Sequence, residues 1–486
     1  MAQRLIDKVA TGVAWSSAEK LGSMLLQMVV SIVVARLLSP EDFGVMAILT
    51  FFTALSLVVV DSGFSQTLIR KEAPTPADYR SVFTFNIAVS LLLYAVLTLT
   101  APLLARFYGL PIIADIAPVL FLLLPINALC VIQNTIFTRE FRFAALSKIT
   151  FAANLVAGVA AIAAALCGWG VWSLVVQRLT MMTTRALLLW RFGTWQDKGQ
   201  FSGTSLRQMA PFSLRLMSTD IIAAVYTNVA QLFIGKIHSA SDLGFFNQAQ
   251  KIKDLPVTSA MMSVQSVTYP ALSNIRHDVD KFAESYRKVL AVTAFVMLPA
   301  MLGLVAIAED MFMLLLGAKW LPTVPYFRIL AFGGIFYPLS MLAYNVLKVY
   351  SNGSIILRLE ILKRIIMTII LAVTIPHSIE AVAYGLTAMS AIDLAINLAS
   401  SLRYTTLSFG RIVRSLLPSA LLGGVMMLAI ELLNRHTTAL PTAAQLSVAI
   451  LAGGAIYIGG ATLLRLEAWR EICDIAKRML RRGAKS

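Results

Sequence analysis

We single out thirteen of the charged residues that lie inside otherwise apolar stretches of the sequence as candidates for a binding site. A charged side chain at the centre of a membrane helix costs about 2.5–3.5 kcal/mol, so such residues usually face an aqueous cavity or one another. Eight of the thirteen are cations and five are anions. A diphosphate group would balance this surplus, because its oxygens match the donors of arginine and lysine. The thirteen are Glu19, Lys20, Arg178, Arg185, Arg215, Asp220, Lys251, Lys253, Asp254, Glu360, Lys363, Arg364 and Asp393.

Lys20 and Arg215 are the first candidates for contact with a diphosphate. They lie in the apolar runs 12–35 and 211–234, which would open two similar halves of the chain. At a rise of 1.5 Å per residue, both would lie roughly 6–12 Å inside the membrane from the cytoplasmic side. Lys251 and Lys253 are the next candidates, because Pro256 should kink their helix by removing a backbone hydrogen bond.

The remaining candidate cations have structural alternatives. Lys363 and Arg364 follow Glu360 by three and four residues, a spacing that allows ion pairs within one helix. Arg178 is predicted to contact the diphosphate, and Arg185, two turns further on, can also extend its side chain to the inner membrane surface.

Acidic residues in the same runs could couple transport to an ion gradient. Asp220 is the best placed of them to bind H⁺ or Na⁺, followed by Asp61, Asp393 and Glu19. The alternative is that each carboxylate only neutralises a neighbouring cation.

The composition of the chain places these residues in a membrane. Of its 486 residues, 58% are hydrophobic and 14% are charged, whereas soluble domains carry about 25% charged residues. Apolar runs long enough to cross the bilayer as helices recur along the whole chain. They are 12–35, 43–64, 81–104, 113–136, 144–167, 170–192, 211–234, 243–269, 289–307, 326–348, 354–375, 380–402, 415–433 and 443–464. We therefore predict an all-α polytopic membrane protein with about 14 transmembrane helices.

Lysine and arginine are distributed unevenly over the connectors between these runs. When the connectors are assigned alternately to the two sides of the membrane, 27 lysines and arginines fall on the side of the termini and six on the other side. This asymmetry is typical of the positive-inside rule, so we expect both termini in the cytoplasm. The net charge of +16 therefore indicates topology, and no nucleic-acid partner is expected.

The pattern basic-x-x-Ser-x-x-Asp-x-Gly occurs twice, at 36–44 and 236–244. A repeat at a fixed interval indicates internal duplication, and six helices per half would give two parallel lobes around a central cavity. We predict an N-terminal lobe at 1–205, a C-terminal lobe at 206–410 and two additional helices at 411–465. Both copies of the pattern are expected in outer loops, where they would shape tight turns and the outer gate.

The tail 466–486 is predicted to be a basic amphipathic helix on the anionic inner leaflet, with a solvated tail as the alternative. The N-terminus lacks the cleavage site of a signal peptide. The three cysteines, Cys130, Cys167 and Cys473, lack the spacing of a metal site or a disulfide framework, so neither metal nor cofactor is expected.

Five segments resemble one family of membrane proteins: 36–44, 242–251, 267–273, 317–320 and 328–330. Over residues 5–410 the chain resembles the bacterial polysaccharide transporters, which are lipid-linked-oligosaccharide flippases of the multidrug/oligosaccharidyl-lipid/polysaccharide exporter superfamily. The resemblance implies alternating access and an undecaprenyl-diphosphate-linked sugar unit, as in O-antigen, colanic-acid or teichuronic-acid synthesis. It also implies the bacterial inner membrane, with membrane lipids and a polysaccharide polymerase as partners.

Two other classes of protein are considered. A multidrug exporter of the same superfamily would need an acidic, aromatic-lined cavity, whereas the cation surplus favours an anionic lipid carrier. A membrane-embedded glycan polymerase or glycosyltransferase is suggested by Asp278 and Asp280, which form a DxD pattern. No nucleotide-binding domain accompanies that pattern, and the outer loops are too short for a polymerase, so we predict a transporter and no enzyme.

Overall fold

The computed structural model describes residues 22–195, 199–275, 277–351, 353–437 and 439–483. Within these residues the regular structure is helical and no strand occurs. The all-α prediction is therefore confirmed. Glu19 and Lys20 lie outside the described residues.

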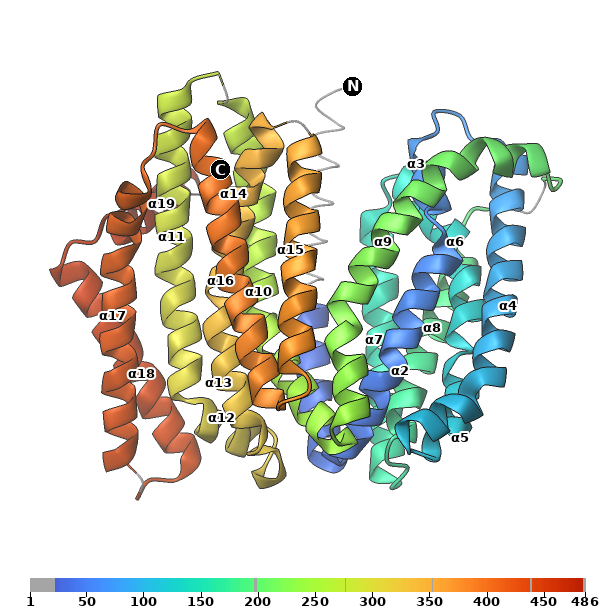
Figure 1. The fold of residues 1–486 in the computed structure, drawn as a ribbon, viewed down its shortest axis with the longest axis horizontal. Helices are drawn as coiled ribbons and strands as arrows, with labels where there is room; N and C mark the ends of the chain where they lie inside the picture. Colours follow the sequence, from blue (N-terminus) through green and yellow to red (C-terminus); the bar gives the residue numbers. More distant parts are fainter. Residues whose placement is uncertain (1–21, 196–198, 276, 352, 438, 484–486) are drawn as a thin grey trace. The chain divides into compact units, whose positions relative to one another are not determined.

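The chain forms two compact units, Met1–Gly244 and Phe245–Ser486. The first unit contains the helix Gly22–Leu37 and then α2 (Pro40–Asp61), α3 (Phe64–Arg70), α4 (Pro76–Tyr108), α5 (Ile112–Leu120), α6 (Leu123–Arg139), α7 (Phe143–Leu166), α8 (Trp172–Phe192) and α9 (Gly203–Ile237). Figure 1 shows how α2, α4 and α6 to α9 run roughly along one another in this unit. α2 packs along α9, α4 packs against α6, and α7 lies against α8.

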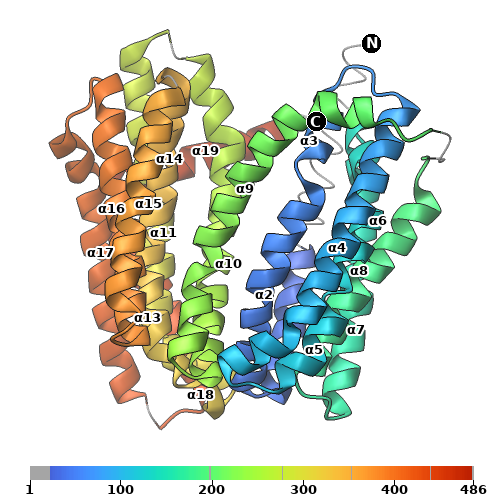
Figure 2. The same ribbon diagram turned by 45° about the vertical axis from the view of Figure 1, so that its right-hand side comes forward.

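The second unit begins within α10 (Ala240–Asn274). It continues with α11 (Val279–Ala306), α12 (Ala308–Leu315), η1 (Ala318–Trp320), α13 (Thr323–Gly334), α14 (Phe336–Tyr350), α15 (Gly353–Thr374), α16 (Ile379–Ser401), η2 (Leu402–Tyr404), α17 (Phe409–His436), α18 (Thr442–Leu463) and α19 (Glu467–Gly483). α11 packs along α17, and α16 packs against α13, α14 and α15 (Figure 2).

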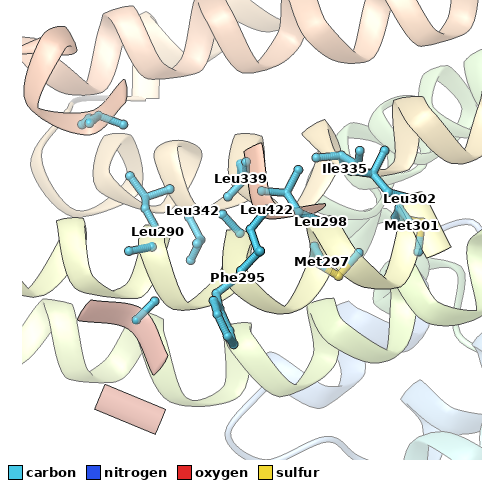
Figure 3. Close-up of a cluster of buried hydrophobic side chains, with 14 of the residues drawn as sticks. Leu290, Phe295, Met297, Leu298, Met301, Leu302, Ile335, Leu339, Leu342 and Leu422 are labelled. Atoms are coloured by element: carbon cyan, nitrogen blue, oxygen red, sulfur yellow. The ribbon is translucent and has the colours of Figure 1, made fainter. Parts of the chain in front are cut away.

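A cluster of buried apolar side chains holds the second unit together (Figure 3). α11 supplies Phe295, Leu298 and Met301, while Leu339 comes from α14 and Leu422 from α17. The cluster has a structural role, since its residues come from α10, α14 and α16, three of the helices that frame the charged cavity described below.

Ten helical stretches among the described residues are long and apolar enough to cross a membrane. Each of the ten coincides with a predicted run. The other four runs correspond to Gly22–Leu37, α8, α10 and α15. The last three carry charged side chains, which lower their hydropathy. The protein is therefore a multi-pass membrane protein, and the number 14 stays a prediction.

The repeated pattern at 36–44 and 236–244 contains a helix-start signal. The amide of Asp42 donates to Ser39 Oγ over 3.2 Å, and the carboxylate of Asp42 accepts from the amide of Ser39 over 2.8 Å. At the start of α10, the amide of Asp242 donates to Ser239 Oγ over 3.0 Å. Such caps satisfy donors that a helix N-terminus leaves free. The serine and aspartate of the pattern thus position α2 and α10 alike.

The predicted lobe boundary at 205/206 comes from the repeat, whereas the boundary at 244/245 comes from packing. α9 lies after the first boundary and before the second, because it packs on α2, α3 and α4. The lobe division by repeat stays a prediction, as do the segments 411–465 and 466–486.

Candidate functional site

A cavity of about 600 Å³ lies in the second unit, between α10, α13, α14, α15 and α16. Six of the thirteen charged residues singled out from the sequence line it; five of them are Lys253, Asp254, Lys363, Arg364 and Asp393. Glu360 completes this charged group. The structure thus brings together side chains that lie up to 140 positions apart in the sequence.

Lys363 is the centre of the charged group and is only 6% exposed. Its Nζ lies 2.9 Å from Asp393 Oδ1 on α16 and also forms an ion pair with Glu360, one turn earlier on α15. Asp393 in turn accepts a hydrogen bond from the hydroxyl of Ser340 on α14. The carboxylate of Asp393 therefore joins three helices, because it binds Lys363 of α15 and Ser340 of α14.

Each cation in this wall of the cavity has a carboxylate beside it. Lys253 Nζ lies 2.7 Å from Asp254 Oδ1, and Arg364 Nη2 lies 3.6 Å from Glu360 Oε2. Three cations therefore stand against three carboxylates. A diphosphate that entered here would have to compete with carboxylates for Lys253, Lys363 and Arg364.

The cavity also has hydrogen-bonding and aromatic surfaces. Asn397 donates to Ser340 Oγ over 2.8 Å, while its own amide oxygen is buried and finds no partner among the described residues. Tyr344 lies with its ring centroid 5.4 Å from Lys363 Nζ, and Tyr337 lines the cavity as well. A polar corner of this kind can hold water.

Lys251 lies on the exposed side of α10, two residues before Lys253. The helix runs unbroken through Pro256. The predicted kink at this proline stays a prediction.

A smaller cavity of about 360 Å³ lies in the first unit and is lined by residues of α2, α3, α6, α8 and α9. It brings together three predicted residues, Asp61, Asp220 and Arg185. Asp61 accepts a hydrogen bond from Ser65, and Arg185 Nη2 donates to Asn134 Oδ1 over 3.1 Å. Two carboxylates and a guanidinium group therefore share one polar cavity within membrane helices.

Three predicted cations among the described residues, Lys251, Arg178 and Arg215, are absent from the linings of these two cavities. Arg178 is exposed on α8, and Arg215 is exposed on α9. Within the described residues, Arg215 forms no ion pair with a carboxylate.

Arg70 is a candidate that the sequence did not indicate. Its guanidinium carbon lies 4.5 Å from the ring centroid of Phe212, which is one turn before Arg215 on α9. Arg70 is exposed and, among the described residues, also lacks a carboxylate partner. Its position at the end of α3 suggested only a topology role, because contact with Phe212 depends on tertiary structure.

The described residues give no candidate metal site. No group of three or more His, Cys, Asp or Glu side chains there could hold a metal ion. Asp278 caps α11 by accepting from the amide of Lys281 over 3.0 Å, and Asp280 accepts from Thr406 over 3.1 Å. The DxD pattern therefore has a local structural role.

The fold and the charged cavities define a membrane protein of the transporter type. The chain belongs to the polysaccharide biosynthesis protein family, whose sequence profile matches residues 33–325. It is 26% identical over 333 residues to the succinoglycan biosynthesis transport protein ExoT of Rhizobium meliloti, covering 68% of this chain and 67% of the relative. It is 23% identical to the teichuronic acid biosynthesis protein TuaB of Bacillus subtilis, covering 68% and 69%.

Solved structures confirm the fold. A structure of the lipid II flippase MurJ, in an inward closed conformation, aligns with a TM-score of 0.75 and covers 94% of this chain and 99% of that one, at 16% identity. An inward-facing multidrug resistance transporter of the MATE family aligns with a TM-score of 0.61, covering 81% and 95%, also at 16% identity. The predicted superfamily fold is therefore found.

Proposed function

We propose that this protein is a flippase that moves polyprenyl-diphosphate-linked oligosaccharide units across the bacterial inner membrane by alternating access. The units would serve the synthesis of a surface polysaccharide such as O-antigen, capsule or exopolysaccharide. Family membership, the transport role in the name of ExoT and the fold shared with a lipid II flippase support this function. The positive-inside distribution supports cytoplasmic termini.

The observation that carries the proposal is a pair of exposed arginines in the first unit: Arg70, which lies over the ring of Phe212, and Arg215, which follows Phe212 by three residues on α9. A membrane helix exposes a guanidinium group at low cost only to water or to an anion. Neither guanidinium group has a carboxylate partner in the described residues. The two groups suit the two phosphates of a lipid carrier, because one guanidinium group can donate two parallel hydrogen bonds to two oxygens of a phosphate. Lys20, from the sequence alone, is proposed to join them.

The other predicted cations rank behind these two. Lys253, Lys363 and Arg364 already have carboxylate partners. We propose that these three cations shape the cavity of the second unit. Lys251 and Arg178 would contact the substrate only transiently during transport.

Coupling to an ion is proposed for the polar cavity of the first unit. Asp61 and Asp220 both line it, and a proton or Na⁺ bound between them would relieve their mutual repulsion. Asp393 is the alternative site, although Lys363 already neutralises it. Glu19 stays a prediction from the sequence, as does transfer of the flipped unit to a polymerase.

The proposal can be tested with purified protein in liposomes. A fluorescent polyprenyl-diphosphate-linked saccharide is placed in the membrane, and a reductant that cannot cross the bilayer measures how fast it changes leaflet. Arg215→Gln and Arg70→Gln should each slow flipping about ten- to a hundred-fold, since a hydrogen bond to a charged group contributes about 1.5–3 kcal/mol. Arg328→Gln is the matched control, because Arg328 is exposed and lies outside both cavities. If the saccharide lipid changed leaflet no faster with the wild-type protein than in liposomes without protein, the proposed function would be refuted.

Cells give an independent test. A strain that lacks the gene should lose surface polysaccharide and accumulate lipid-linked units on the cytoplasmic side. Unchanged surface polymer, in a strain without a redundant transporter, would contradict the proposal.

A multidrug exporter is the second candidate. The cavity of the second unit has the acidic and aromatic surfaces that such a protein needs, from Asp254, Glu360, Tyr337 and Tyr344. The cations beside the carboxylates argue against it, because they would repel a cationic drug. Efflux of a cationic dye by the purified protein, with no leaflet exchange of the lipid-linked saccharide, would favour this candidate.

A further inference from the structure

The helix α19 is docked on α11 through its acidic residues. Arg287 Nη1 donates to Glu467 Oε2 over 2.8 Å, and a second hydrogen bond joins Nη2 to the other carboxylate oxygen. Lys288, the next residue of α11, forms an ion pair with Glu471. Glu467 and Glu471 are one turn apart, so one face of α19 is engaged by two adjacent cations.

An apolar face of α19 adds to this docking. Ala468 is buried, and Ile472 packs against the apolar cluster of the second unit. The ring of Trp469 lies 5.9 Å from that of Phe295 on α11, and Phe295 lies 4.9 Å from Tyr457 on α18. The first half of α19 therefore lies against the protein on two sides.

The charges of α19 are divided along its length. Its acidic residues, Glu467, Glu471 and Asp474, all lie in the first half. Residues 475–486 contain five cations and no acid: Lys477, Arg478, Arg481, Arg482 and Lys485. The half that carries the acids contacts α11, and the sequence leaves the basic half without an acidic residue of its own to pair with.

We propose that α19 is an interfacial helix whose basic second half binds the headgroups of anionic phospholipids, while its acidic first half holds it on α11. Charge complementarity selects this partner, because a surface of anionic lipid attracts each nearby lysine or arginine by about 1 kcal/mol. Trp469 fits the same location, since tryptophan is enriched at the boundary between membrane and water. The inference goes beyond the proposed function and does not depend on it.

The experiment uses the full-length protein in nanodiscs. Cys473 is labelled with a fluorescent dye after Cys130→Ala and Cys167→Ser remove the other two thiols. Quenching of the dye by neutral acrylamide is compared in discs of phosphatidylcholine alone and in discs that also contain phosphatidylglycerol. We expect the dye to be better protected in the anionic discs, and high salt should remove the difference.

Charge variants identify the residues responsible. Neutralising Lys477, Arg478, Arg481 and Arg482 with glutamine should abolish the lipid-dependent protection, with the equilibrium changing about five-fold for each charge, the equivalent of about 1 kcal/mol. Arg478→Lys, Arg481→Lys and Arg482→Lys together form the matched control, because they keep the charge. Equal quenching in both kinds of disc would overturn the proposal. The proposal would also be overturned if the dye were protected in discs of phosphatidylcholine alone once a soluble acidic protein was added, and if this protection required the four cations. The partner of the basic half would then be an acidic protein and not anionic lipid. The dye experiment does not depend on leaflet exchange of a saccharide lipid. Lipid binding by α19 and the flippase function are therefore tested separately.

Discussion

A Cβ atom on Gly44 would lie 1.8 Å from the carbonyl oxygen of Ala240, so the first turns of α2 and α10 touch backbone to backbone. The contact is reciprocal, because a Cβ atom on Gly244 would lie 1.9 Å from the carbonyl oxygen of Pro40. Residues 40 and 240 hold the same place in the repeated pattern, as do residues 44 and 244. The glycine of the pattern is therefore required by a close approach of two equivalent helix starts.

Gly44→Ala should destabilise the protein by about 1–3 kcal/mol, because the added methyl group has no room against the backbone of α10. Gly244→Ala should behave in the same way. The measurement is the midpoint of thermal unfolding of the purified protein. Gly454→Ala is the control, since no atom lies within 4 Å of a Cβ there and alanine favours a helix by about 1 kcal/mol over glycine. Equal midpoints for Gly44→Ala and Gly454→Ala would show that the contact is looser than described.

Lys363→Met should cost about 3–5 kcal/mol of stability, because it leaves the partly buried Asp393 without its cation, whereas Glu360 keeps Arg364. Adding Asp393→Asn to this variant should restore part of the loss, since the unpaired charge disappears. Chemical unfolding of the two single variants and the double variant measures the coupling. Lys253→Met should cost less than about 1 kcal/mol, as its partner Asp254 is half exposed. If the effects of Lys363→Met and Asp393→Asn on the free energy of unfolding were additive, a direct interaction between Lys363 and Asp393 would be excluded.

Arg139→Gln should loosen the segment that follows α3. The guanidinium group of Arg139 donates to the carbonyl oxygens of Ile69 over 3.1 Å, Lys71 over 2.6 Å and Glu72 over 3.2 Å, and also to that of Leu68. Leaving these acceptors unpaired costs about 1–3 kcal/mol. Trypsin should therefore cleave after Arg70 or Lys71 faster than in the wild type.

Arg142→Gln serves as the control for this cleavage. Arg142 makes longer contacts, 3.5 Å to Glu140 and 3.4 Å to the carbonyl oxygen of Phe192. Unchanged cleavage in Arg139→Gln would mean that the segment is held by other contacts.

Asp220→Asn should uncouple leaflet exchange from an ion gradient while leaving the protein folded, because Asp220 is exposed on α9 and lines a polar cavity with Asp61. The test compares flipping in liposomes with and without a gradient of H⁺ or Na⁺. Asp115→Asn is a control, since Asp115 lies outside that cavity. If flipping by the Asp220→Asn variant still responds fully to the gradient, Asp220 is not part of the coupling site.

Acid should release α19 from α11. The hydrogen bonds from Arg287 lower the pKa of Glu467 below its ordinary value of 4.5. A carboxyl group whose pKa is lowered on folding stabilises the docked state above that ordinary value, and the contribution is lost as the pH falls through the lowered pKa. The dye on Cys473 should therefore become more accessible to acrylamide only below about pH 4.5. In Glu467→Gln this part of the pH dependence should be absent, and a wild-type profile in that variant would contradict the role of the pair.

Hydropathy predicted most of the fold, because each membrane helix must satisfy its own backbone and therefore appears in the sequence as an apolar run. Hydropathy identifies most clearly the membrane helices that carry few charged residues. α10 and α15 were predicted from the same pattern, although their charged residues make them less apolar than a typical span.

The candidate site was predictable only in part. The sequence selected Lys363 and Asp393 as buried charges, and it offered Glu360 as a partner for Lys363 because helical spacing is local. The pairing of Lys363 with Asp393 joins two helices and depends on their packing. The contact of Arg70 with Phe212 was missed for the same reason, since 142 residues separate them and no local spacing relates them.

The pair Lys363–Asp393 also constrains how the protein enters the membrane during its synthesis. α15 carries Arg358, Glu360, Lys363 and Arg364, and a charge near the centre of a lone helix, such as Lys363, adds about 2.5–3.5 kcal/mol to the cost of leaving the translocon. The countercharge on α16 emerges from the ribosome 30 residues after Lys363. α15 should therefore wait at the translocon until α16 has been made, and the two helices should enter the lipid together as a hairpin.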